Sequence, residues 1–306
     1  MVGYRLLTYE YKSASGAGIL VGDRVYRVSD VIEDERDVLG LLQDWESAHA
    51  SILAFLDSDK SKQISHIPLA DITLQAPIQY PSNFYCAGAN YWDHLKEMGE
   101  FVRKMTGNLP SMEKAPEPWF FVKTTRGTII GDGPARIPGF TAQLDWEAEL
   151  GVVIGSATRD MSEDDAMSAV AGYVIVNDLS ARDLIKREGS PFIYDWIGQK
   201  CFDDAAPMGP WFTPAAYIDD PQKLDVTLAV NGVLKQSSNT DQMVHSIAEQ
   251  VAYLSRHVTL YPGDVIATGT PSGVGMPHAE FLRPGDEVVV EISGLGKLTS
   301  RMVSDS

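Results

Sequence analysis

Cysteine is rare in this sequence. Its 306 residues include two cysteines, Cys86 and Cys201, which lie far apart and lack the spacing of a metal-binding pair. A disulfide scaffold needs more cysteines, and a cysteine-based zinc site needs them closer together. The sequence therefore argues against both kinds of structure.

Long apolar segments are missing as well. No window approaches the roughly 20 consecutive apolar residues that a membrane-spanning helix requires. The N-terminal stretch lacks the basic segment, apolar core and small-residue cleavage site of a secretory signal. These features predict no membrane partner and a cytoplasmic location.

Basic residues are outnumbered by acidic ones. There are 25 lysines and arginines against 42 aspartates and glutamates, so the formal net charge is −17. Such a polyanion repels phosphate backbones, and no basic stripe is visible, so nucleic acid is not an expected partner. The hydrophobic content of 44% and the charged content of 22% are typical of a globular protein.

The pattern of short strands and fewer helices predicts a β-rich α+β fold in two parts. The boundary is placed in the proline-punctuated segment 74–84. It separates a small N-terminal α/β module, residues 1–78, from a catalytic domain, residues 79–306. The module is expected to contain strands at 4–11, 16–22 and 24–32 and helices at 36–45 and 47–58.

Turn signals punctuate the second part. Asn231-Gly232 predicts a type I′ turn in a hairpin over 224–236. Pro-Gly-Asp turns at 262–264 and 284–286 are each followed by an apolar strand. Helices are expected at 91–105, 162–170, 180–188 and 243–257.

Three carboxylates stand out among the many acidic residues. Glu147 and Glu149 flank one alanine in a strand-like run, so they share a face and repel each other unless a cation lies nearby. Asp178 follows another apolar run, just before Ser180 and Asp183, which have capping-box spacing. An all-oxygen set of this kind favours Mg²⁺, Mn²⁺ or Ca²⁺. The alternative is a solvated strand face and a turn.

Other side chains have patterns that suit catalysis. His94 and Glu97 share a helix face, so the carboxylate can orient the imidazole as a base that activates water. The other five histidines have no comparable partner. Lys123 and Lys200 interrupt apolar stretches and either face an anion or extend their heads into water. Thr270 lies in a glycine-rich loop, 267–275, without the phosphate-binding signature.

Taken in order, these motifs resemble the fumarylacetoacetate hydrolase family. The resemblance covers roughly residues 80–303. It is carried by GANYWDHLKEM at 88–98, FFVKTT at 120–125, LDWEAELGVVIG at 144–155, GYVIVNDLSARDL at 172–184, QKCFDDAAPMGP at 199–210 and GDVIATGTPSGVG at 263–275. It implies a mixed β-sandwich roll, preceded by a small N-terminal domain, and a homodimer.

The resemblance also implies roles for individual residues. Glu147, Glu149 and Asp178 would hold Mg²⁺ or Mn²⁺, with Ca²⁺ as a further option. His94 and Glu97 would activate water beneath a mobile lid, and Lys200 would assist catalysis. The residues expected to contact the substrate are Thr270, Gln199, Arg182, Lys123, Tyr91 and Gly269.

The implied activity is hydrolysis of a carbon–carbon bond in a 1,3-diketo acid of the acylpyruvate type. The His-Glu pair favours this reaction because it needs an activated water. The alternatives are a 2-oxo acid decarboxylase or a keto-enol tautomerase on the same metal site, and a non-catalytic acidic binding protein. A long lid, 98–117, and Ile185, where many relatives have glutamine, leave the substrate open.

Overall fold

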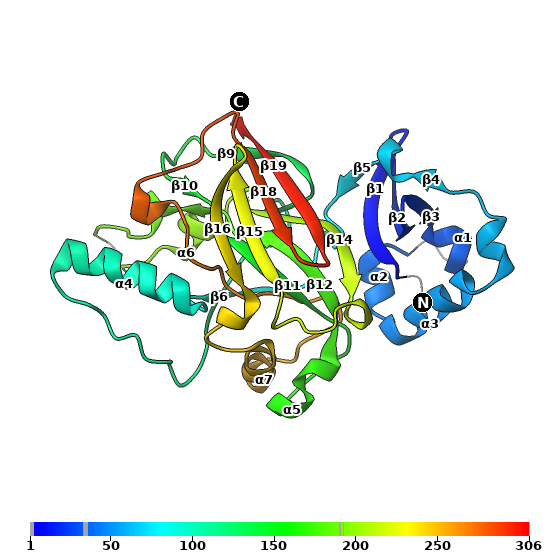
Figure 1. Ribbon diagram of the computed structural model, residues 1–306, viewed down its shortest axis with the longest axis horizontal. Coiled ribbons are helices and arrows are strands. Elements are labelled where there is room, and N and C mark those ends of the chain that lie inside the picture. The colour runs from blue at the N-terminus through cyan, green and yellow to red at the C-terminus, as the bar shows by residue number, and fades with distance from the viewer. Residues whose placement is uncertain (1–2, 33–35, 190, 192, 306) are drawn as a thin grey trace.

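The computed structural model describes residues 3–32, 36–189, 191 and 193–305. Its strands form a 12-stranded sheet, a five-stranded sheet and a two-stranded ribbon, with helices around them (Figure 1). This arrangement confirms the predicted β-rich α+β class. Within the described ranges, no helix combines the length and apolar character needed to cross a membrane.

The N-terminal segment, described over residues 3–32 and 36–78, lies on the right in Figure 1, in blue and light blue, and forms one end of the 12-stranded sheet. Its strands are β1 (Arg5–Tyr11), β2 (Ala14–Val21), β3 (Arg24–Arg27), β4 (Ile67–Pro68) and β5 (Thr73–Gln75). Its helices are α1 (Val28–Ile32), α2 (Val38–Leu42) and α3 (Trp45–Leu56), with short 3₁₀ turns at Asp59–Lys62 and Leu69–Asp71. The strand predicted over 24–32 is thus wrong beyond Arg27, where the chain turns into α1.

The rest of the large sheet is built from seven further strands. They are β6 (Phe84–Gly88), β7 (Trp119–Val122), β8 (Ile129–Ile130), β11 (Ala148–Ile154), β12 (Val170–Asn177), β14 (Ala206–Pro214) and β17 (Val265–Ala267). The main path runs β4-β3-β2-β1-β14-β12-β11-β17-β6-β7, with β5 on β1 and β8 on β14. All residues of β11 and β12 are buried, as expected for central strands covered on both faces.

The five-stranded sheet covers one face of these central strands. It has the order β16-β15-β18-β19-β9, and its strands are β9 (Gly133–Ile137), β15 (Asp225–Val230), β16 (Val233–Asn239), β18 (Glu287–Ile292) and β19 (Gly296–Ser304). Val152 packs in the core between the sheets, whereas the next residue, Val153, packs in the cluster on the other face. Asn231 and Gly232 have positive φ angles of 51° and 76°, which confirms the predicted turn.

The second part contains four α-helices within the described ranges. These helices are α4 (Trp92–Thr106), α5 (Glu163–Ala166), α6 (Trp196–Lys200) and α7 (Ile247–His257), with 3₁₀ turns at Met167–Ala169, Arg182–Leu184, Ala215–Tyr217, Thr240–Gln242 and Met276–His278.

The helix predicted over 180–188 is wrong. The chain there begins with β13 (Ser180–Ala181), which pairs with β10 (Leu144–Asp145). Ser180 Oγ donates to the carbonyl of Asp178 and Asp183 accepts from Thr141, so these two residues form no capping box.

The N-terminal segment and the remainder share both a sheet and a hydrophobic cluster. β1 pairs with β14 at Leu6 and Phe212. Ile52 of α3 and Val176 of β12 belong to the same buried cluster. The predicted boundary after residue 78 falls between β5 and β6 and stays a prediction.

The close approach of β12 and β14 gives a test of the packing. A Cβ added at Gly172 would lie 2.2 Å from the carbonyl oxygen of Thr213. We therefore expect Gly172→Ala to lower the free energy of unfolding by about 1–3 kcal/mol, the usual cost of overpacking. Urea unfolding would measure it. Gly139→Ala is the matched control, because nothing lies within 4 Å of a Cβ there; equal stability of the two variants would contradict the argument.

Candidate active site

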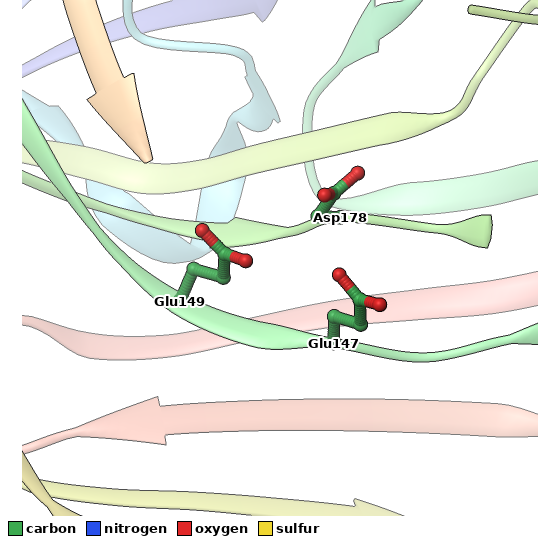
Figure 2. A group of neighbouring side chains, drawn as sticks. All are labelled: Glu147, Glu149 and Asp178. Atoms are coloured by element: carbon green, nitrogen blue, oxygen red, sulfur yellow. The ribbon is translucent and has the colours of Figure 1, made fainter. Parts of the chain in front are cut away.

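Three buried carboxylates converge where β11 and β12 meet. Glu147 and Glu149 share a strand face, and the β-ladder places Glu149 opposite Val176, two residues before Asp178. One carboxylate oxygen from each acidic residue lies within 4.8 Å of the others. Figure 2 shows Glu147 and Glu149 extending from one strand toward the side on which Asp178 lies. The exposed fractions are 6%, 1% and 1%, respectively, so the solvated-face alternative does not describe them.

Two lysines neutralise part of this charge. Lys200 Nζ, at the end of α6, donates to Glu147 Oε2 at 2.8 Å and to Asp178 Oδ2 at 2.6 Å. Lys123 Nζ lies 2.7 Å from Asp178 Oδ1. Its three hydrogen bonds go to the carbonyl oxygens of Leu179, Lys200 and Ala205. Lys123 therefore holds the surrounding backbone together as well as compensating the aspartate.

Arg182 completes the set of buried cations. Its guanidinium donates to Asp145 Oδ2 at 2.8 Å and to Glu147 Oε1 at 2.6 Å. Asp145 also accepts hydrogen bonds from the backbone N–H groups of Gly275 and Met276. The sequence analysis did not identify Asp145, although residues 145, 147 and 149 alternate along an extended segment in the way that places side chains on one face.

The charges in the cluster change the pKa values of its members. Burial would raise the pKa of Glu147, but the charges of Lys200 and Arg182 outweigh it and lower that pKa strongly. Burial raises the pKa of Glu149, and the charges of Asp178 and Glu147 raise it further. Burial would lower the pKa of Lys200, yet Asp178 and Glu147 raise it, so its ammonium stays charged.

The donor set fits a hard divalent cation. Glu149 receives a single hydrogen bond within the described residues, from the N–H of Gly269 at 2.9 Å. Asp178 Oδ1 is buried and accepts no hydrogen bond within the same residues. Buried carboxylate oxygens with spare lone pairs suit Mg²⁺ or Mn²⁺. Once Glu149 is deprotonated, the four carboxylates, including Asp145, outnumber the three cationic side chains, and a cation would compensate the remaining negative charge.

The His-Glu pair lies on the first turns of α4. His94 Nδ1 is buried and lies 3.7 Å from Glu97 Oε2, which is too long for a hydrogen bond. The N–H of Gly273 donates to both Glu97 oxygens, at 3.1 and 3.0 Å. Burial would raise the pKa of Glu97, but the contacts with His94 and Gly273 outweigh it and lower that pKa.

Glu97 has another neighbour that the sequence did not indicate, because His278 Nε2 lies 3.3 Å from Glu97 Oε1. His245 Nδ1 likewise lies 3.8 Å from Glu249 Oε1. The expectation that the other histidines lack a comparable partner is therefore wrong for His278 and for His245. The imidazole of His278 is 58% exposed, whereas that of His94 is 13% exposed. Of the two histidines near Glu97, His94 is therefore the one that lies inside the site.

Beyond α4 the predicted lid leaves the body of the protein and returns along α7, as Figure 1 shows. Lys114 Nζ contacts Glu249 of α7 at 2.5 Å, and Arg256 of the same helix donates to Glu117 at 3.2 Å. Two ion pairs thus attach the returning half of the lid to α7. Met105 and Leu109, which precede both ion pairs in the chain, are 72% and 54% exposed.

A cavity of about 270 Å³ contains most of the predicted residues. Its walls include His94, Glu147, Glu149 and Lys200, together with Ala87, Gly88, Ala89, Trp119, Phe121, Arg182, Trp196, Gln199 and Thr270. Of the predicted substrate contacts, Thr270, Gln199 and Arg182 thus line the cavity, whereas Lys123, Tyr91 and Gly269 are not among its lining residues. Tyr91 is fully buried, and its hydroxyl has no hydrogen-bond partner among the described residues.

Comparison with known proteins gives consistent matches over most of the chain. Residues 83–303 match the model of the family described as fumarylacetoacetate (FAA) hydrolase C-terminal. A human mitochondrial oxaloacetate tautomerase is 37% identical over 243 residues, which are 79% of this chain and 73% of the relative.

Solved structures match nearly the whole chain. A fumarylacetoacetate hydrolase from psychrophilic Exiguobacterium antarcticum is 31% identical, with a TM-score of 0.79, and the match covers 98% of this chain and 99% of that one. Maleylpyruvate hydrolase from Sphingobium, solved with manganese(II) ion and pyruvate, is 27% identical, with a TM-score of 0.77 and coverage of 99% and 100%.

The buried contacts of Lys123 generate a stability prediction. We expect Lys123→Met to lower the free energy of unfolding by about 3–5 kcal/mol, because it leaves Asp178 as a buried charge with less compensation and removes donors from three carbonyls. Denaturant unfolding would measure the loss. Lys223→Met, which breaks an exposed ion pair with Asp220, should change nothing measurable. A Lys123→Met protein as stable as wild type would refute this structural role.

The raised pKa of Glu149 predicts that cation binding depends on pH. Without a cation the side chain keeps its proton to higher pH than an ordinary glutamate, whereas a metal ligand must be deprotonated. Mn²⁺ binding should therefore release protons and weaken as pH falls through the raised pKa. Calorimetric titrations in two buffers of different ionisation enthalpy would count the protons. Glu149→Gln should abolish the release, and wild-type binding without proton release would contradict the prediction.

Proposed function

The chain belongs to the fumarylacetoacetate hydrolase family, and on this premise we propose that it is a divalent-metal-dependent hydrolase. Its substrate would be a 1,3-diketo acid of the acylpyruvate type, and the bond cleaved would join the acyl carbon to the pyruvate methylene. The observation that carries the proposal is that His94 lines the same cavity as Glu147 and Glu149. A residue that can deprotonate water therefore lines the same cavity as two residues that would hold a metal ion, which could stabilise an anionic oxygen.

Glu147, Glu149 and Asp178 would hold Mg²⁺ or Mn²⁺, and the manganese in the Sphingobium relative supports this assignment. Such an ion supplies Lewis acidity that stabilises negative charge developing on substrate oxygens. The buried cations of the chain act in the same direction. Lys200 remains charged between Glu147 and Asp178, so it can donate a hydrogen bond to an oxyanion.

His94 would take a proton from water, and the hydroxide would attack the acyl carbonyl. The carbon–carbon bond then breaks, its electron pair passes to the pyruvate fragment as an enolate, and a proton returns to carbon. The products are a carboxylic acid and pyruvate. Glu97, held by Gly273 and His278, orients the imidazole and stabilises its protonated form. The raised pKa of Lys200 favours its role as a charge stabiliser over that of a proton donor.

A second candidate is a keto-enol tautomerase, or a decarboxylase, acting on a 2-oxo acid. The likeness to the human oxaloacetate tautomerase favours it. Such reactions use the same stabilisation of negative charge on oxygen, but they need no attacking water. The homodimer implied by the family resemblance is proposed alongside either activity.

Substitution of His94 separates the two candidates. We expect His94→Ala to lower acylpyruvate cleavage about 10²- to 10⁴-fold, the usual contribution of a general base, and EDTA to abolish it. Pyruvate release measured with added Mn²⁺ gives the rate. His257→Ala, an exposed histidine on α7, is the control and should retain full activity.

The same proteins should then be assayed for the conversion of enol to keto oxaloacetate. Metal-dependent tautomerisation that survives His94→Ala, in a protein that cleaves no acylpyruvate, would favour the second candidate. Cleavage by His94→Ala at the wild-type rate would remove His94 from the mechanism.

A further inference from the structure

Three aromatic side chains form one part of the cavity wall. Trp119, Phe121 and Trp196, here called the aromatic wall, line the same cavity as Glu147 and Lys200. Trp196 stacks on Phe121 with a centroid distance of 5.6 Å and an interplanar angle of 20°, and its ring lies 4.8 Å from that of Trp119. Together the rings present aromatic surface to the interior of the cavity.

Strand alternation and one glycine position the wall. Trp119 and Phe121 share one face of β7, whereas Phe120, on the other face, stacks on Tyr253. Gly88 is paired with Trp119 across the ladder, and a Cβ at Gly88 would lie 2.4 Å from Trp119 Cε3. The indole can therefore lie over β6 only because residue 88 is glycine.

The wall is directly connected to the charged end of the cavity. Trp196 and Lys200 are the first and last residues of α6. Lys200 Nζ lies 5.1 Å from the centroid of Phe121. A ligand whose anionic end meets the carboxylate and lysine cluster would therefore place its other end against aromatic surface.

Charge distribution limits what that other end can be. The lining residues that can carry a positive charge are His94, Arg182 and Lys200. Arg182 and Lys200 are already paired with buried carboxylates, and His94 faces Glu97. Apart from the aromatic wall and the two glutamates, the other lining residues within the described ranges are the uncharged Ala87, Gly88, Ala89, Gln199 and Thr270. A second carboxylate beside the wall would therefore find no unpaired cation in the lining, whereas an apolar ring would gain by leaving water.

We propose that the acyl group of the substrate is a flat apolar group, such as an aromatic ring, that stacks on the aromatic wall. This inference rests on the proposed hydrolase function and specifies its substrate class. Stacking of one ring pair contributes roughly 2- to 12-fold in affinity beyond the apolar area it buries. The preferred substrates are accordingly aroylpyruvates, rather than acylpyruvates that end in a second carboxylate.

Three probes test the proposal with the Mn²⁺-loaded protein: benzoylpyruvate, acetylpyruvate and fumarylpyruvate. We expect kcat/KM to be at least about tenfold higher for benzoylpyruvate than for the other two. Trp196→Ala should lower kcat/KM about tenfold for benzoylpyruvate and less than about twofold for acetylpyruvate, whereas Trp196→Phe should retain most of the preference. Tyr261→Ala, which removes an exposed aromatic outside the cavity lining, is the matched control.

Binding separates failure of this inference from failure of the proposed hydrolysis. Calorimetry with Mn²⁺-loaded His94→Ala protein would give Kd for benzoylpyruvate and acetylpyruvate without cleavage. Tighter binding of benzoylpyruvate that is lost with Trp196→Ala supports the wall even if wild type cleaves nothing, in which case the hydrolase proposal alone fails. Equal affinities, or equal losses for both probes, overturn the inference and leave the hydrolase proposal intact. Trp119→Ala provides a second variant should Trp196→Ala not fold.

Discussion

Compensation of buried negative charge is the constraint on which the centre of this structure depends. Asp145, Glu147, Glu149 and Asp178 are at most 6% exposed, and a buried carboxylate is tolerated only with cations or hydrogen-bond donors around it. The cations come from distant parts of the chain: Lys123 follows β7, Arg182 follows β13 and Lys200 ends α6. Each must reach the same point, so the connections between strands are fixed by charge as well as by apolar packing.

Hydrogen bonds to carboxylates also fix the first turns of α4, which precede the lid. Asp93, in the first turn of α4, accepts hydrogen bonds from Ser238 Oγ and from the N–H of Ser272, and Glu97 accepts from the N–H of Gly273. The first turns of α4 are thus bonded to the loop that follows β17, which also supplies Thr270 to the cavity. His94 therefore has a position set by the body of the protein, whereas exposed residues lie further along the lid.

Local features of the sequence predicted local structure well. The shared face of Glu147 and Glu149 follows from strand alternation alone, and the Asn231-Gly232 turn follows from the φ angles these residues tolerate. Contacts between distant segments account for several of the errors. Ser180 and Asp183 have capping-box spacing, yet one bonds to the carbonyl of Asp178 and the other to Thr141. The partners of Asp145 and His278 are equally distant, so no local pattern indicated them.

The two halves of the cavity bear differently on the candidate reactions. The charged half serves hydrolysis and tautomerisation alike, since both develop negative charge on oxygen. The aromatic half, in contrast, distinguishes between the two reactions. Oxaloacetate carries a carboxylate at each end, and a carboxylate beside Trp119 or Trp196 would find no unpaired cation among the described lining residues. Hydrolysis of an acylpyruvate, by contrast, requires the acyl carbonyl to be held within reach of a water near His94, and stacking of a flat acyl group would restrict its position. The aromatic surface therefore supports the hydrolase over the tautomerase.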